Sequence, residues 1–307
     1  MALVLIKALS LVAVVAIGYG FKRLGWLRQE HFSVLAIIVL RITLPAALIT
    51  SFNSITITGT MAWLILIGLA VNVIQQLFTW VIARHRTPER RSFATLHAGS
   101  YNIGAFAMPY VSQLVGGSGV VYTAMFDIGN SLAVGGIGYS WGLALVSKKK
   151  TTWQRFLLTM VRSPVFDVYL VLLVLRLARL SFPSPVITFT SLVGQANPFC
   201  AMLMIGLGLE LRLPKHKWLR AATYLLRRYI FVIVFSLAIW FGLPGSVFSH
   251  EIKVVLMMVL WAPVAAMVSG FVDETKGDVQ LSSLITSISV VVAIVMMPVV
   301  YLLANGG

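Results

Sequence analysis

Polar residues inside long apolar stretches are the candidates for chemistry in this sequence. Asn102 stands seven residues before Pro109, in a run that also contains Gly104. Glycine and proline in such a run favour an unwound segment. Its backbone N–H groups, and the positive end of a half-helix beginning near Pro109, could bind an anion. The Asn102 amide could then donate to a carboxylate. The alternative is a proline kink, with the asparagine bonded to a neighbouring helix.

A second interruption is expected near Trp261 and Pro263. Trp261 could form an apolar wall for the hydrocarbon part of a ligand, or it could be a core residue. Pro263 lies 65 residues after Pro198, and Pro109 lies 64 residues after Pro45. Pro198 follows Pro45 by 153 residues, close to half of the 307 in the chain. The matched spacing indicates an internal repeat.

Ionisable side chains inside apolar runs form a second group of candidates. A charge at the depth expected for Asp127 costs about 2.5–3.5 kcal/mol, so such residues usually face the protein interior and often mark an ion or proton path. Asp127, with Asn130 one turn later, is therefore a candidate for coupling. Arg41 could pair with Asp127, bind a substrate, or extend its charged end to the interface. His97 could carry protons, or it could be a hydrogen-bonded core residue.

The elements that position these residues must lie in a bilayer. Apolar residues make up 59% of the chain and charged residues 11%, with a mean hydropathy of +0.93. A soluble domain is roughly 45–50% apolar and about 25% charged. Because a span needs about 20 apolar residues, the apolar runs predict an all-α integral membrane protein with ten transmembrane helices. These are expected at 3–21, 31–51, 60–83, 93–115, 119–146, 164–181, 184–210, 222–243, 250–272 and 279–304.

No room remains for a soluble catalytic domain. The sequence also lacks the zinc-binding, nucleophile-elbow and phosphate-loop motifs of common enzymes. We therefore expect no enzymatic activity, no cofactor and no metal.

The basic residues predict the orientation in the membrane. The net charge of +15 would suggest a nucleic-acid partner in a soluble protein. Here most Lys and Arg fall in odd-numbered loops, and Arg227 and Arg228 count among them. The positive-inside tendency then places odd-numbered loops in the cytoplasm and both termini outside the cell membrane. We expect a lipid bilayer as partner and no nucleic acid.

Five spans per repeat is an odd number, so the second copy must enter the membrane from the opposite side. The halves 1–153 and 154–307 are therefore predicted to be inverted repeats, a design typical of secondary transporters. The interrupted fourth and ninth spans would correspond to each other. Their freed backbone groups must face protein, water or ligand, since lipid cannot satisfy them.

In the order and spacing of these landmarks the chain resembles the auxin efflux carrier family, which includes the plant PIN-type carriers and their bacterial relatives. The residues that carry the resemblance are Asn102 with Pro109, Pro45, Pro263 to Asp278, and Cys200 to Gly208. The resemblance implies that spans 4 and 9 cross at mid-membrane. It also implies a scaffold of spans 1, 2, 6 and 7 that forms a homodimer, and a mobile transport domain of spans 3–5 and 8–10.

By the same resemblance Asn102 would contact the carboxylate of an organic anion, and small carboxylates such as malate or malonate are associated with bacterial relatives. Lys148 to Arg162 is short beside the long central loop of the plant carriers. Arg41 and Asp127 are further departures from the plant pattern.

The sequence thus predicts a secondary transporter that exports a small organic anion by an elevator-like motion. An interior-negative potential favours exit by about 2.3 kcal/mol per charge per 100 mV. Two alternatives remain: a sodium- or proton-coupled symporter of organic anions, and a membrane sensor that transports nothing. Sodium would need several oxygen ligands, and acidic residues at the crossing are few. The predicted substrate-binding residues are Asn102, Gly104, Pro109, Trp261, Pro263 and Arg41, and the coupling candidates are Asp127 and Asn130.

Overall fold

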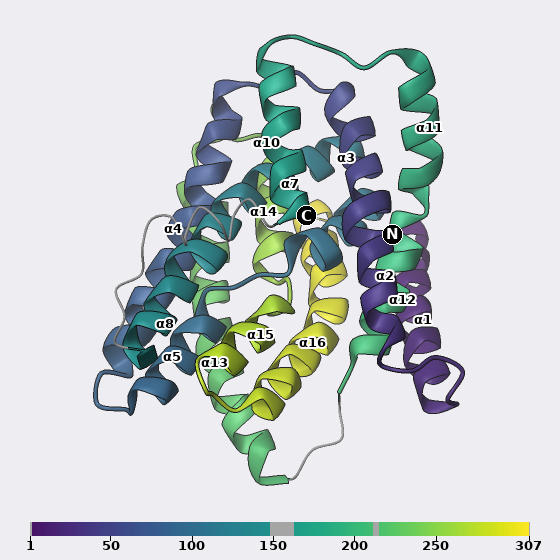
Figure 1. Cartoon of the computed structure of the whole chain (residues 1–307). Helices are drawn as coiled ribbons and strands as arrows, with labels where there is room; N and C mark the ends of the chain where they lie inside the picture. The colour runs from purple at the N-terminus through teal and green to yellow at the C-terminus, as the bar shows by residue number, and fades with distance from the viewer. Residues whose placement is uncertain (1, 148–162, 211–214, 307) are drawn as a thin grey trace.

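The computed structural model describes residues 2–147, 163–210 and 215–306, and all regular structure in these ranges is helical (Figure 1). The helices are α1 (Ala2–Arg23), α2 (His31–Ile38), α3 (Leu44–Asn53), α4 (Gly59–Ile82), α5 (Pro88–Ala98), α6 (Met108–Leu114), α7 (Gly117–Ser131), α8 (Tyr139–Ser147), α10 (Pro164–Leu177), α11 (Ser184–Gln195), α12 (Asn197–Gly208), α13 (Lys215–Gly242), α14 (His250–Leu260), α15 (Met267–Glu274) and α16 (Val279–Asn305). Short π-helical turns at Val39–Thr43, Ile103–Ala107 and Leu132–Gly138 precede α3, α6 and α8. The predicted boundary between the halves, at 153/154, lies outside the described residues.

Seven helical segments of the described chain are long and apolar enough to cross a membrane, and each coincides with a predicted span. They are Ala2–Arg23, His31–Asn53, Gly59–Ile82, Gly117–Ser147, Ser184–Gly208, Lys217–Gly242 and Val279–Asn305. The predicted spans at 93–115 and 250–272 are each divided into two shorter helices. The span predicted at 164–181 ends at Leu177, because Arg179 adopts a left-handed backbone conformation with φ of 58°. The prediction of an all-helical integral membrane protein is confirmed.

Two prolines shape their helices without breaking them. Pro45 and Pro109 each lie at the second position of a helix, directly after a π-helical turn. A proline has no N–H, and its ring clashes with the carbonyl four residues earlier. A wider preceding turn relieves this conflict. The helix break expected beside Pro109 therefore lies elsewhere in the same span.

The two real interruptions meet each other. Residues 99–102 between α5 and the turn at Ile103–Ala107 are not helical, and neither are residues 261–266 between α14 and α15 apart from isolated turns. The backbone N–H of Asn102 donates to the carbonyl of Pro263 over 2.8 Å. The second half-helix of the fourth span thus begins at Ile103, and the expectation that it begins near Pro109 was wrong. The contact joins segments about 160 residues apart in the chain.

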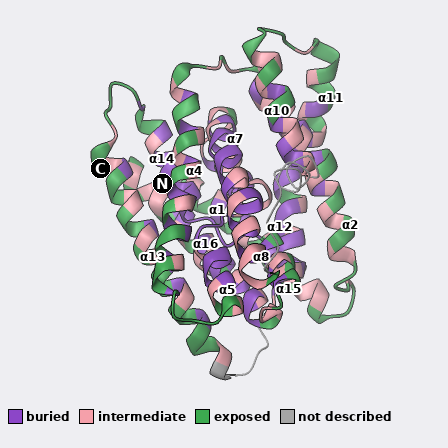
Figure 2. Ribbon diagram, turned by 60° about the vertical axis from the view of Figure 1, so that its left-hand side comes forward, coloured by how far each residue is buried: buried purple, intermediate pink, exposed green. Residues whose placement is uncertain are grey.

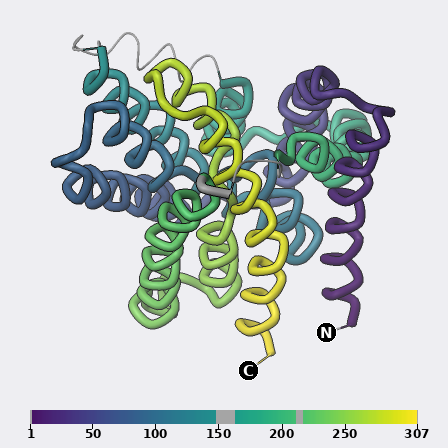
Figure 3. The backbone as a smooth tube through the Cα atoms, turned by 90° about the horizontal axis from the view of Figure 1, so that it is seen from below, coloured from purple at the N-terminus to yellow at the C-terminus, as the bar shows by residue number. Residues whose placement is uncertain are grey.

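The helices form two groups. In one, α1 packs on α12, and α3 packs on α10 and α11. In the other, α4 packs on α5 and α7, and α13 on α14 and α16. Seen from below, the N-terminal helices and α11–α12 lie beside the group that contains α4, α5, α13 and α16 (Figure 3). Helices α7 and α14 are buried along most of their length, whereas α2 has no buried residue and α13 has exposed residues along its described length (Figure 2).

The close approach of α1 and α12 depends on two glycines. A Cβ added to Gly206 would collide with the carbonyl oxygen of Val15, and one added to Gly18 would collide with that of Leu203. Small residues let transmembrane helices approach at backbone distance, where van der Waals contact replaces the hydrophobic effect that is weak in lipid.

Candidate functional site

Side chains from α4 hold the non-helical backbone of the first interruption. The Gln76 amide donates to the carbonyls of Gly99, at 2.8 Å, and Ala133, at 3.3 Å. The Tyr101 hydroxyl donates to the Gln75 side-chain oxygen over 3.0 Å. In the bilayer interior an unpaired backbone group costs several kcal/mol. Gln76 therefore stabilises the backbone of the interruption, and Gln75 holds the Tyr101 side chain.

Arg228 of α13 performs the same task at both interruptions. Its guanidinium donates to the carbonyls of His97 and Ala98, which end α5, and to that of Ala262, which follows α14, over 3.3, 2.8 and 3.2 Å. It also lies 4.2 Å from the ring centre of Tyr101. A cation suits the negative C-terminal end of a helix, and here one cation serves two such ends.

The position of Arg228 corrects the assignment of this residue to a cytoplasmic loop. Helix α13 runs from Lys215 to Gly242, and Arg227 and Arg228 lie inside it, as they also lie inside the predicted span 222–243. Arg228 is 2% exposed, whereas the adjacent Arg227 is exposed. Only one of these two adjacent basic residues can act as an orientation signal.

A cavity of about 310 Å³ lies beside the crossing. Asn102, Gly104, Asp127 and Asn130 line it, together with apolar residues of α2, α12 and α16. Both second half-helices begin at this cavity, since residues 103–105 and 265–267 also line it. The first N–H groups of a helix have no acceptor within the helix. The cavity therefore receives the positive ends of two half-helices.

The Asn102 side chain is half-buried in this cavity and has no hydrogen-bond partner among the described residues. The alternative in which its amide is bonded to a neighbouring helix is thus not observed. An amide in this position offers both donor hydrogens and an acceptor oxygen to a ligand.

Asp127 lies on the cavity wall and is 6% exposed. Its two carboxylate oxygens accept hydrogen bonds from Asn130 and from the hydroxyl of Tyr169 on α10, both at 2.8 Å. Asn130 also accepts from the Tyr101 amide, over 3.3 Å, and donates to the Tyr101 carbonyl, over 3.0 Å. The two coupling candidates are therefore linked to each other and to the first interruption. In the described part of the chain His, Cys, Asp and Glu form no group of three that could hold a metal.

Four of the predicted substrate-binding residues do not line the cavity. Arg41 is exposed on the outside of the molecule, in the π-helical turn before α3, so it does not pair with Asp127. Pro109 is buried beyond the first turn of its half-helix. Trp261 stacks on Tyr229, with ring centres 5.4 Å apart. Pro263 contributes its carbonyl, which accepts a hydrogen bond from the backbone N–H of Asn102.

His97 has two partners and is 3% exposed. Its ring nitrogens lie 2.8 Å from the Phe93 carbonyl and 2.9 Å from the Ser282 hydroxyl. It does not line the cavity, which corresponds to the alternative of a hydrogen-bonded core residue.

Sequence reasoning missed Arg228, Tyr169 and the two glutamines of α4. The pair Gln75–Gln76 inside an apolar run was a usable signal, because polar side chains in a span need a partner. Tyr169 carries no such signal, since tyrosine is common in membrane helices. Arg228 carries no separate signal, because the adjacent Arg227 led both residues to be assigned to a basic loop.

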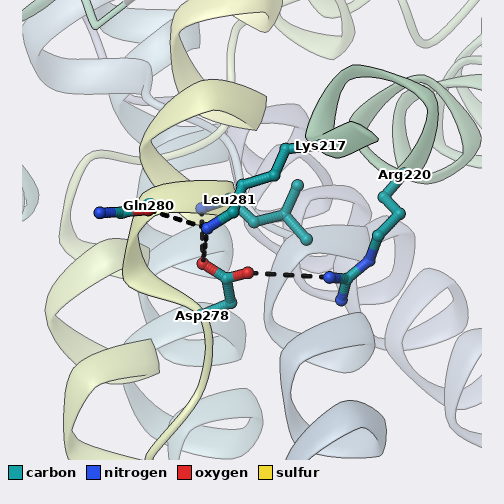
Figure 4. Close-up of polar contacts among 5 residues, drawn as sticks. All are labelled: Lys217, Arg220, Asp278, Gln280 and Leu281. Atoms are coloured by element: carbon teal, nitrogen blue, oxygen red, sulfur yellow. Dashed lines mark hydrogen bonds and ion pairs between the residues drawn. The ribbon is translucent and has the colours of Figure 1, made fainter. Parts of the chain in front are cut away.

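A charged cluster connects the starts of α13 and α16, away from the cavity (Figure 4). Asp278 accepts from the Leu281 amide and from Lys217, both at 3.0 Å, and Arg220 lies 3.7 Å from its other oxygen. Partial burial alone would raise the pKa of Asp278, but the Leu281 amide, Lys217 and Arg220 together hold it below its usual value. The carboxylate thus caps α16 and ties it to α13.

Comparison with known proteins agrees with this architecture. Residues 3–150 match a family described as membrane transport protein, and residues 198–306 match the sodium bile acid symporter family. An uncharacterized transporter of Methanothermobacter thermautotrophicus is 24% identical over 295 residues, which cover 94% of this chain and 95% of that protein. The predictions of a transport protein and of no enzyme are thereby confirmed. These similarities support a secondary transporter and agree with the resemblance to the auxin efflux carrier family.

Proposed function

We propose that the protein exports a small organic anion, a carboxylate, which binds in the cavity beside the crossing. The observation that carries this proposal is the side-chain amide of Asn102, which lies between two half-helix starts and has no hydrogen-bond partner among the described residues. Both helix dipoles favour a negative group at this place. Arg228 adds a positive charge behind the Tyr101 ring. The mostly apolar remainder of the wall suits the hydrocarbon part of a small ligand.

We further propose that the chain folds as two inverted five-helix repeats, with ten spans when the divided helices are counted once. Gln75 and Arg228, which both serve the interruptions, are 153 residues apart, the same separation as Pro45 and Pro198. The Thr43 hydroxyl also donates to Asn197 over 2.9 Å, beside those two prolines. Helices α4 and α13, which correspond in the two halves, thus each contribute a polar residue at the same position that contacts the interruptions. This supports a common design for the halves.

An elevator-like motion is proposed between the two helix groups, with α4–α8 and α13–α16 as the transport domain and α1–α3 and α10–α12 as the scaffold. Few polar ties join the groups among the described residues. Lys7 donates to the Gln113 carbonyl, Tyr169 to Asp127, and the Glu210 amide to Ser287. A mostly apolar boundary allows one group to slide past the other at small cost. Movement of the crossing would carry the ligand with it.

Both termini are proposed to lie outside the cell, and the scaffold is proposed to form a homodimer. The first follows from the basic loops and the second from the family resemblance. Labelling of introduced cysteines in intact cells tests the orientation. Cross-linking of the purified protein tests the dimer.

Flux of radiolabelled carboxylates into proteoliposomes tests the proposed function, with membrane potential and sodium varied separately. We expect malate or malonate to cross without sodium. Strict sodium dependence would instead support the symporter alternative. The match of residues 198–306 to the sodium bile acid symporter family favours that alternative. Flux of organic cations alone, or of no solute, would refute the proposal, and the latter would favour a sensor.

The site itself is tested by Asn102→Ala. We expect this variant to fold but to lose at least tenfold in carboxylate flux, because a free amide is replaced by a methyl group. Asn305→Ala is the matched control, since Asn305 is exposed in the last turn of α16. Normal flux in the first variant would exclude Asn102 from the site.

A further inference from the structure

Asp127 is an acidic side chain in a cavity where the described lining contains no lysine, arginine or histidine. Its carboxylate is held by two hydrogen bonds from neutral groups, the Tyr169 hydroxyl and the Asn130 amide. Among the described residues no cation contacts this carboxylate; Arg228 lies behind the Tyr101 ring and is bonded to three backbone carbonyls. A carboxylate in that setting can exist in either protonation state, and its neighbours decide which is favoured.

The same carboxylate lies beside the start of the half-helix at Ile103. A Cβ added to Gly104 would stand 3.7 Å from Asp127 Oδ2 and 3.6 Å from the Tyr169 hydroxyl. Asp127 therefore occupies the region of positive helix dipole to which the proposed substrate would bind. Two anionic groups this close disfavour each other strongly at low dielectric constant.

We propose that Asp127 binds a proton when the carboxylate substrate binds, so that the protein carries the two together. The inference rests on the proposed function. One proton adds to an Asp127 oxygen on the side where substrate enters and leaves it on the side where substrate is released. In the conformation described, Tyr169 and Asn130 can stay bonded to the acid form, because a hydroxyl can accept as well as donate and an amide donates to either form.

Among the described residues that line the cavity, Asp127 is the one carboxylate. Tyr169 comes from α10, whose charged residues Asp167 and Arg176 do not line the cavity, and the backbone of Tyr101 is bonded to Asn130. Helices α3, α4 and α6, which also pack near α7, carry no charged residue. The charged residues of α14 are in its first turn, away from the crossing.

Coupling of this kind changes the energetics of transport. A monoanion that moves with one proton carries no net charge, so the membrane potential does not drive it. A dianion with one proton still carries one negative charge outward. The direction is then set by the gradients of the carboxylate and of protons together.

The test uses the full-length protein in proteoliposomes that contain a pH-sensitive dye, with malate outside and the potential held at zero by valinomycin and potassium. Malonate replaces malate if malate is not carried. We expect substrate entry to acidify the interior with about one proton per molecule. An inward proton gradient of one pH unit should raise accumulation about tenfold, since one unit corresponds to a factor of ten in the equilibrium.

Asp127→Asn imitates the protonated acid without a titrating group. We expect it to exchange labelled for unlabelled substrate but to lose proton uptake and gradient-driven accumulation. Asp167→Asn is the control, because Asp167 lies in the first turn of α10 and does not line the cavity.

Substrate entry without proton entry in the unaltered protein would overturn the inference, whether or not the variants fold. Persistent coupling in Asp127→Asn would overturn it as well. If no carboxylate crosses at all, the proposed function fails first, and the inference fails with it.

Discussion

Replacement of Arg228 by methionine should destabilise the crossing more than any other single change on α13. The side chain is 2% exposed and donates to three carbonyls at two helix ends. Methionine fills a similar volume but donates nothing. The carbonyls of His97, Ala98 and Ala262 would then face a medium without alternative donors.

The magnitude follows from these bonds. A buried acceptor that loses its partner costs about 1–3 kcal/mol, and the bonds at 3.2 and 3.3 Å are weaker than the one at 2.8 Å. Removal of the charge also ends the cost of burying a guanidinium, which offsets part of the loss. We expect a net decrease in the free energy of unfolding of about 2–4 kcal/mol.

Denaturation in mixed micelles, followed by tryptophan fluorescence, measures this difference. Arg227→Met is the matched control, because it removes the same residue type from the adjacent, exposed position. The free energy of unfolding of Arg228→Lys should lie between those of the unaltered protein and Arg228→Met, since a lysine keeps the charge but lacks the planar guanidinium that reaches both helix ends. If Arg228→Met were as stable as Arg227→Met, the capping role of Arg228 would be refuted.

Two further changes test other contacts. Gly206→Ala should lower the free energy of unfolding by roughly 1–3 kcal/mol and separate α1 from α12, because its Cβ would collide with the Val15 carbonyl. Gly20→Ala, which has open space around its Cβ, should have no such effect in the same denaturation assay. Asp278→Ala should cost about 0.5–2 kcal/mol through loss of the α16 cap, whereas Asp278→Asn keeps a cap and loses only the ion pairs. Because the folded-state pKa of Asp278 is depressed, its ionic contribution is present above the unfolded-state pKa of about 3.9 and is lost as pH falls through the folded-state value. The stability difference between the unaltered protein and Asp278→Asn should therefore narrow below about pH 4, and a difference that stayed constant to pH 3 would contradict this assignment.

The amino-acid sequence determined the class of fold and most helix positions. Apolar runs near the length of a span become helices because lipid offers the backbone no other partners. Asn102 could be identified for the same reason. A polar residue in a glycine- and proline-containing run marks a non-helical segment whose backbone groups need hydrogen-bond partners other than lipid.

The tertiary structure decided which side chains meet at the crossing. Arg227 and Arg228 are adjacent residues of the same type, so the sequence does not distinguish them. Only the packing of α13 against the interruptions buries Arg228. The Tyr169 hydroxyl is bonded to Asp127, 42 residues earlier in the chain. The backbone N–H of Asn102 is bonded to the carbonyl of Pro263 in the other half of the chain. Hydropathy reports whether a segment prefers lipid to water, a local property. Partners between distant helices depend on how those helices rotate and cross, which local composition does not specify.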